Sequence, residues 1–163
     1  MMTHHRSLEV TAPGDREIVM TRIFNAPRAL VFDAFTKPEL IVRWLLGPDG
    51  WVMTVCEVDL QPGGMFHYVW RNDSEDKEFG LTGEYREVAA PARIIHAERF
   101  DQSWYPGDAI VTTTFAESDG TTTVTLLSSF SSREIRDGAL ESGMEKGVAA
   151  SFDRLERILS LSS

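Results

Sequence analysis

The sequence predicts an α+β fold in which a curved antiparallel sheet of about seven strands wraps around a long C-terminal helix, with two short helices after strand one. Three observations predict this fold. Apolar residues alternate with period two between residues 51 and 130, and turn residues interrupt that stretch at short intervals. Helical spacing occurs before it, in 27–46, and after it, in 133–160. The last helix has the length and the apolar stripe to cover one face of a strongly twisted sheet.

One strand and two short helices open the predicted domain. The segment "REIVMTRIF" (16–24) is rich in β-branched and apolar residues and indicates a strand. Pro27 suits the first turn of a helix that runs to about Phe35. Pro38 suits the first turn of a second helix, "KPELIVRWLL" (37–46). Together they predict a helical hairpin inserted after the first strand.

Six further strands are predicted within residues 51–130. Turn signals such as Pro62-Gly63-Gly64 and Asp119-Gly120 separate them, and strands joined by such short turns pair antiparallel. The six segments are "WVMTVCEVDL" (51–60), "MFHYVWRN" (65–72), "FGLTGEYREV" (79–88), "ARIIHAERF" (92–100), "DAIVTTTFAE" (108–117) and "TTTVTLLSSF" (121–130).

The last segment, 133–160, predicts one amphipathic helix of roughly 40 Å. Gly143 and Gly147 share a face of it, where they permit either close contact with the sheet or space for a guest molecule. The apolar face of the helix carries Met144, Val148, Phe152, Leu155 and Leu159.

Length and charge limit the classes of function. A chain of 163 residues fits one domain, and we expect a flexible N-terminal segment (1–15) followed by a single domain (16–163). A net charge of -9 opposes nucleic-acid and membrane partners, because both attract clustered Lys and Arg. One cysteine, Cys56, and no signal peptide predict a cytoplasmic protein. Cys56 alternates with Val52 and Val58, which favours a buried structural thiol.

Four segments in order carry a resemblance to a known family: "FNAPRALVFDAFTKPELIVRWLLGPDGW", "DLQPGGMFHYVW", "GEYREVAAPARIIHAERF" and "SGMEKGVAASFDRLERIL". The chain resembles the START-like superfamily known as SRPBCC, which has the helix-grip fold. Within this superfamily, the chain is similar to the AHSA-type branch. That branch is similar to the C-terminal domain of the activator of the ninety-kilodalton heat-shock-protein ATPase. The resemblance implies a deep cavity between sheet and C-terminal helix, used in different members for lipids, steroids, polyketides or other apolar molecules. Two departures from the family pattern, Leu45-Leu46 before Gly47 and Val148 after Gly147, would enlarge that cavity.

Phe66, Tyr68 and Trp70 share one face of their strand, and two interpretations of them stay open. They are either packed core or the wall of a cavity. Buried Tyr and Trp need partners for their polar atoms, and the number of such residues favours a cavity. The predicted ligand-binding residues are Trp44, Trp51, Phe66, Tyr68, Trp70, Tyr85, His96, Glu98, Phe100, Phe130, Met144, Val148 and Phe152.

His96 and Glu98 are the candidate catalytic residues. Read through the family pattern, both point to the inner face of strand 92–100, with Tyr85 on a neighbouring strand. Such a pair in a cavity would serve as a hydrogen-bonding or acid/base centre. The alternative is that Glu98 reaches the cavity mouth and pairs with an arginine, or that the strand register is shifted.

The usual signatures of cofactor and metal sites are missing. No Walker loop, dinucleotide fingerprint, G-x-S-x-G, H-E-x-x-H or C-x-x-C occurs, so we expect neither cofactor nor metal. His4 and His5 lie in the predicted flexible start and do not indicate a metal site.

Three functions follow as hypotheses. The first is a cofactor-free binding protein for a small apolar or aromatic molecule. The second is an enzyme of cyclase, dehydratase or hydrolase type that uses the same cavity, with His96 as acid or base. The third is a co-chaperone-like role in stress response, or binding to a transcriptional regulator, with the chaperone or regulator as protein partner. Monomer and homodimer are both compatible with the sequence.

Overall fold

A computed structural model describes residues 7–103 and 105–161 of the chain. Its strands form one antiparallel sheet in the order β1-β2-β8-β7-β6-β5-β4-β3. The strands are β1 (Glu9–Thr11), β2 (Glu17–Phe24), β3 (Val52–Val58), β4 (Met65–Asn72), β5 (Lys77–Ala89), β6 (Arg93–Phe100), β7 (Ala109–Ser118) and β8 (Thr121–Ser129). The helices are α1 (Arg28–Thr36), α2 (Pro38–Trp44), α3 (Arg133–Glu141) and α4 (Met144–Leu161). The predicted α+β fold is confirmed.

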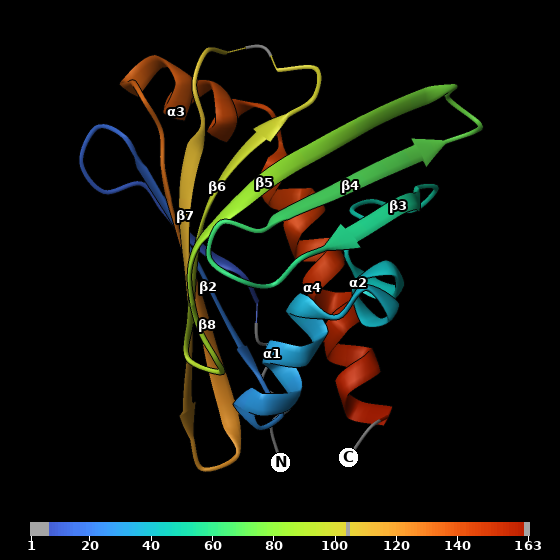
Figure 1. The fold of residues 1–163 in the computed structure, drawn as a ribbon, viewed down its shortest axis with the longest axis vertical. Helices are drawn as coiled ribbons and strands as arrows, with labels where there is room; N and C mark the ends of the chain where they lie inside the picture. The colour runs from blue at the N-terminus through green and yellow to red at the C-terminus, as the bar shows by residue number, and fades with distance from the viewer. Residues whose placement is uncertain (1–6, 104, 162–163) are drawn as a thin grey trace.

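The sheet bends around α4, as Figure 1 shows. Strands β2, β7 and β8 run beside one another, whereas β3, β4 and β5 lean away from them and give the sheet a concave side. Helices α1, α2 and α4 lie on that side, and α3 lies at the opposite end of the strands from α1. Helix α1 contacts β7, β8 and α4, while α2 contacts β3 and α4. The two short helices therefore close one end of the space between α4 and the sheet.

The sheet has eight strands, one more than predicted, because β1 adds to its edge. Strand β1 pairs with β2, with Val10 opposite Met20. The buried Arg136 of α3 donates from Nη1 to the carbonyl oxygens of Gly14 and Glu17, at 3.2 and 3.0 Å, and so fixes the turn between the two strands. Three residues are too few for a period-two pattern, so the sequence did not indicate this strand. Residues 1–6, with both histidines of the start, lie outside the described residues.

The prediction of one continuous helix over 133–160 is wrong. Helices α3 and α4 meet at Ser142 and Gly143, and Gly143 has a φ of 82°, in the left-handed region that favours glycine. Ser142 ends α3, because its backbone N–H donates to the carbonyl oxygen of Gly138 (3.0 Å) and its hydroxyl to that of Ala139 (2.6 Å). The apolar spacing from Met144 onward belongs to α4 alone. Periodicity cannot show that a glycine turns the chain between two helical segments.

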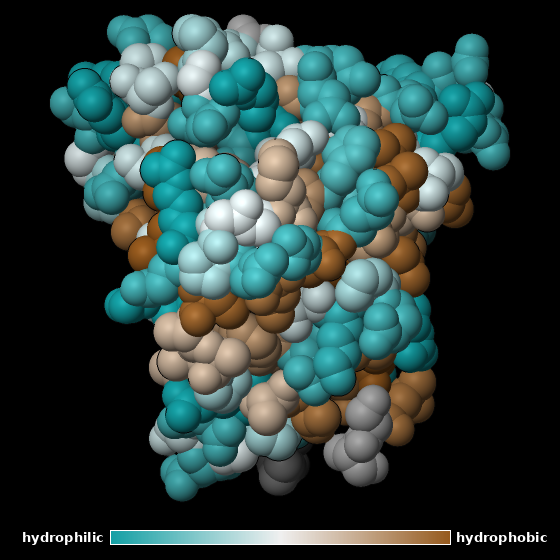
Figure 2. Space-filling view, viewed as in Figure 1, coloured by the Kyte–Doolittle hydropathy of each residue, from teal (hydrophilic) through white to brown (hydrophobic). Residues whose placement is uncertain are grey.

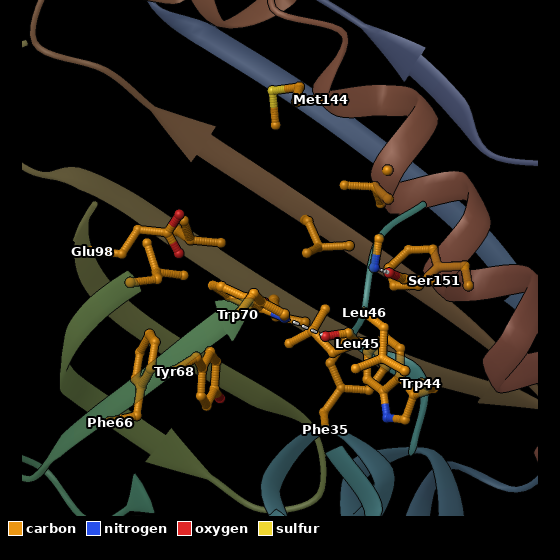
Figure 3. A pocket seen from close by; sticks show the side chains of 18 of the residues that line it. Phe35, Trp44, Leu45, Leu46, Phe66, Tyr68, Trp70, Glu98, Met144 and Ser151 are labelled. Atoms are coloured by element: carbon orange, nitrogen blue, oxygen red, sulfur yellow. Dashed lines mark hydrogen bonds between the residues drawn. The ribbon is translucent and has the colours of Figure 1, made fainter. Parts of the chain in front are cut away.

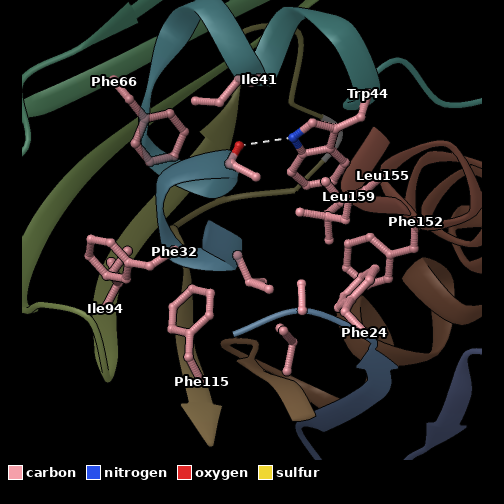
Figure 4. Close-up of a cluster of buried hydrophobic side chains, with 14 of the residues drawn as sticks. Phe24, Phe32, Ile41, Trp44, Phe66, Ile94, Phe115, Phe152, Leu155 and Leu159 are labelled. Carbon is pink, nitrogen blue, oxygen red and sulfur yellow. Dashed lines mark hydrogen bonds between the residues drawn. The ribbon is translucent and has the colours of Figure 1, made fainter. Parts of the chain in front are cut away.

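Two clusters of buried side chains fill the two ends of the space under α4. The larger cluster fills the α1 end, where Phe32 meets Phe115 edge to face at 5.3 Å and Phe24 meets Phe152 at 5.5 Å (Figure 4), and it continues into the rings of β4. The smaller cluster joins β2, β7 and α3 and consists of Ile18, Met20, Ala109, Phe130, Ile135 and Ala139. The middle of the concave side is left for the cavity described below.

A bulge in β3 changes which residues share a face. The register with β4 shifts between Met53 and Val55, so Val52 pairs with Arg71 while Cys56 pairs with Tyr68. The predicted alternation of Val52 with Cys56 is therefore wrong, because one extra residue reverses the side-chain direction. Only the pairing with β4 reveals the extra residue.

Hydrophobic residues reach the surface among polar ones on the face shown in Figure 2. The side chains of Val52 and Met65 are 54% and 52% exposed, and they lie in β3 and β4. Strand β3 is the last strand in the sheet order. The choice between monomer and homodimer stays a prediction.

The break between α3 and α4 predicts opposite effects of alanine at the two glycines. Gly143→Ala should lower the free energy of unfolding by about 1 kcal/mol, because a left-handed backbone disfavours a Cβ. Gly147→Ala should raise it by about 0.5 to 1 kcal/mol, because alanine is the better helix former. A Cβ at Gly147 would meet only ordinary contacts, the nearest being Cδ of Pro48 at 3.7 Å. Urea unfolding of both variants measures the difference, and stabilisation by Gly143→Ala would contradict the observed break.

Candidate functional site

A cavity of about 490 Å³ lies between the concave face of the sheet and α4. Its volume falls in the range of about 300 to 1,000 Å³ that small-molecule sites occupy. Its walls come from the sheet, α1, α2, α4 and the loop after α2. Twelve of the thirteen predicted ligand-binding residues line it: Trp44, Trp51, Phe66, Tyr68, Trp70, Tyr85, His96, Glu98, Phe100, Met144, Val148 and Phe152.

Phe130 is the predicted residue that the structure places elsewhere. It lies just after β8 and is buried in the smaller cluster, with its ring 6.5 Å from that of Tyr105. The alternation along β8 correctly predicted the side of the sheet on which Phe130 lies. It did not predict that α3 covers this end of the sheet, because the break between α3 and α4 is a tertiary feature.

The aromatic wall on β4 depends on a glycine of β5. Phe66 stands opposite Gly83, and a Cβ on Gly83 would overlap the ring of Phe66. Without that Cβ, the ring lies against the backbone of β5 and packs 4.7 Å from the ring of Tyr68. Trp70 follows along the same face, and its Nε1–H donates to the carbonyl oxygen of Leu45 at 2.7 Å (Figure 3). These rings are thus both close-packed and cavity-lining.

Two tyrosine hydroxyls supply neutral polar groups to the cavity. The rings of Tyr68 and Tyr85 both pack against that of Phe66, at 4.7 and 5.4 Å. Burial raises the pKa of Tyr68 well above 10.0, and burial raises the pKa of Tyr85 to about 12. Both phenols therefore keep their protons at physiological pH and act only as hydrogen-bonding groups there.

His96 and Glu98 form a pair at the sheet side of the cavity. Nε2 of His96 lies 2.7 Å from Oε1 of Glu98, and their side chains are 14% and 24% exposed. The ring of Phe66 meets that of His96 edge to face at 5.0 Å, and Tyr85 stands opposite His96 on β5. Among the described residues, Glu98 forms its ion pair with His96. The alternative, in which Glu98 pairs with an arginine, is therefore wrong. The pair can accept hydrogen bonds or move a proton at the edge of an apolar space.

Residues 45–48, in the loop after α2, form a wall of the cavity that α4 holds in place. The backbone N–H of Gly47 donates to Oγ of Ser151 at 2.8 Å, as Figure 3 shows. Arg154 donates to the carbonyl oxygens of Trp44 and Gly47 at 3.1 and 3.2 Å. Leu45-Leu46 stand out in the sequence as a departure from the family pattern, but these anchors do not, because an irregular loop has no period.

Part of β5 lines the cavity without having been predicted to do so. Phe79 and Leu81 line the cavity, and the ring of Phe79 stacks on that of Trp70 at 5.0 Å. Period two from Tyr85 back along the strand would have found both residues. Other residues that line the cavity were not among the predicted ligand-binding residues either: Met20, Phe35, Ile94, Val111, Thr113, Leu126, Ser128 and Ser151.

Neither a metal cluster nor a membrane span is found in the described part of the chain. No three His, Cys, Asp or Glu side chains between residues 7 and 161, Trp104 aside, are grouped so that they could hold a metal ion. None of the helices within these residues is both long and apolar enough to cross a membrane.

A sheet that curls around a C-terminal helix and leaves an apolar cavity between them defines the helix-grip class of START-like proteins. Residues 25–160 match the family model described as Activator of Hsp90 ATPase homolog 1-like protein. The chain belongs to this family.

Solved bacterial structures are similar to this chain. A Rhodobacter sphaeroides protein is 26% identical with a TM-score of 0.88, and the match covers 95% of this chain and 99% of that one. A Staphylococcus epidermidis protein is 29% identical with a TM-score of 0.78, covering 93% and 94%. An AHSA1-like protein from Aeromonas hydrophila, 22% identical, shares the fold with a TM-score of 0.71, covering 87% and 93%. No curated protein matches the chain.

The reactivity of the Cys56 thiol tests whether this side chain is buried beside the cavity. Burial, with a smaller contribution from the carboxylate of Glu39, raises the pKa of this thiol to about 11. We expect iodoacetamide at pH 8 to alkylate the folded protein about 100-fold more slowly than the urea-unfolded chain, because only the thiolate reacts. Cys56 is the single cysteine, so the label reports this position alone. The rate should rise about tenfold per pH unit up to pH 10 while circular dichroism stays native. A plateau below pH 9 would contradict the raised pKa.

Proposed function

We propose that the chain binds a small apolar or aromatic molecule in the cavity between the sheet and α4, without a cofactor. The observation that carries this proposal is the space of about 490 Å³ that the side chains of an aromatic-rich core leave unfilled. Apolar space of this size is costly to keep empty, because its walls lose contacts that a guest would restore. The few polar groups in it, among them His96, Glu98 and the two tyrosine hydroxyls, would orient the guest.

Native mass spectrometry of the protein purified from its own host tests the proposal directly. Spectra before and after organic extraction should differ by the mass of a retained compound, which extraction then identifies. The same mass difference in repeated preparations supports binding. An empty protein that shows no thermal shift with a panel of hydrophobic metabolites would count against it.

A cavity-filling variant predicts loss of binding without loss of fold. Val148 of α4 lines the cavity, and Val148→Trp should weaken binding of the neutral fluorescent probe N-phenyl-naphthylamine by at least about tenfold, because the indole takes the space of the guest. Val42→Trp is the matched control, since Val42 is exposed on α2. Fluorescence titration gives the affinities, and thermal unfolding verifies that both variants fold. Equal affinities for the two variants would place the probe outside the cavity.

An acid/base enzyme on the same cavity is the second candidate, favoured by the 2.7 Å contact between His96 and Glu98. In this function His96 would take or give a proton and Glu98 would hold its ring in orientation. A metabolite screen should then find a turnover that His96→Ala reduces by about 100- to 10,000-fold. His67→Ala is the control, because His67 bonds to Asp101 instead and is absent from the described cavity wall. Turnover that both variants retain would argue against an acid/base role.

A further inference from the structure

We propose that the cavity prefers ligands whose aromatic or apolar body carries a protonated amine, with Glu98 as the counter-ion. This inference rests on the proposed binding function and adds the chemical class of the ligand. It is carried by the distribution of charge around the cavity.

Glu98 is the only Asp, Glu, Lys or Arg among the described residues that line the cavity. Two arginines at α4, Arg22 of β2 and Arg154 of α4 itself, are engaged elsewhere, and Arg157 of α4 is not among the residues that line the cavity. Arg22 pairs with Asp153 at 2.8 Å, and Arg154 binds carbonyl oxygens of the loop and Asp49. A carboxylate or phosphate ligand would therefore meet a negative charge and no cationic side chain in the wall.

His96 does not reverse this preference. A neutral His96 donates its Nε2–H to Glu98, which leaves the pair with one negative charge. A protonated His96 makes the pair neutral, because Glu98 lies 2.7 Å away and balances the added charge. In neither state does the pair offer a net positive charge to an anion.

Glu98 has both the capacity and the access to bind a donor. A carboxylate accepts about four hydrogen bonds, and His96 supplies one of them at Oε1. Figure 3 shows the Glu98 side chain directed from its strand into the cavity, with Trp44 and Leu46 on the other side of the view. An ammonium group on a ligand body that fills the aromatic part can thus reach the carboxylate.

Aromatic rings lie next to the pair. The ring of Phe66 lies 5.0 Å from that of His96, and the ring of Tyr85 lies 6.4 Å from it. Aromatic faces attract an ammonium ion, most strongly where water is displaced. Since both tyrosine hydroxyls of the cavity stay neutral, they add no competing charge.

Three probes with one aromatic body and different head groups test the inference: naphthylethylamine, naphthylethanol and naphthylacetate. Calorimetric titration at pH 7.5 should give the amine an affinity about tenfold above that of the alcohol, because hydrogen bonds to a charged partner are stronger than neutral ones. The acetate should bind most weakly. Glu98→Gln should bring the amine to within about threefold of the alcohol while the alcohol changes little.

Glu84→Gln is the matched control. It removes the same charge from the neighbouring strand β5, where Glu84 is exposed, and should leave the amine preference intact. Equal binding of all three probes, or an amine preference that survives Glu98→Gln, would overturn the inference and leave the proposed binding function standing. Failure of all three to bind the wild-type protein would instead count against the binding function, and the inference would fall with it.

Discussion

Helix α4 is tied to the rest of the fold through Phe152. Its ring lies 5.5 Å from that of Phe24 in β2, 5.8 Å from Trp44 in α2 and 5.9 Å from Phe35 in α1. The indole of Trp44 is itself fixed by donating Nε1–H to the carbonyl oxygen of Ala34 at 2.9 Å. Rings of this size hold the helix away from the sheet and pack as densely as a crystal. Because the cluster under α3 supports the other end, the space between the two clusters stays open.

The one ionised side chain of the described cavity wall is paired, which limits the cost of placing a charge in an apolar space. Oε1 of Glu98 lies 2.7 Å from Nε2 of His96, so the carboxylate has a partner before any guest arrives. Tyr68 and Tyr85 differ from it, because both phenols are neutral at physiological pH. An apolar wall with one charged group is suited to fix the direction in which a guest lies.

Helix α4 serves the cavity with two of its faces. Its apolar stripe supplies Val148 and Phe152, while Ser151 and Arg154 satisfy backbone groups of the loop that includes residues 45–48. Loop backbone beside an apolar cavity has little water to bond with, so these side chains take its place. The position of the loop and the position of the helix therefore depend on each other.

The sequence by itself indicated seven of the eight strands, the two short helices and the shared face of Phe66, Tyr68 and Trp70, because alternation of side chains in a strand is a local property of the backbone. The inward direction of His96 and Glu98 came from the family resemblance. The sequence did not determine whether the rings fill the space or line it, since that depends on the distance of α4 from the sheet. Only the tertiary structure placed Phe130 under α3. It also gave Gly83 its role, because a missing Cβ makes room for Phe66 only once β4 and β5 are paired in register.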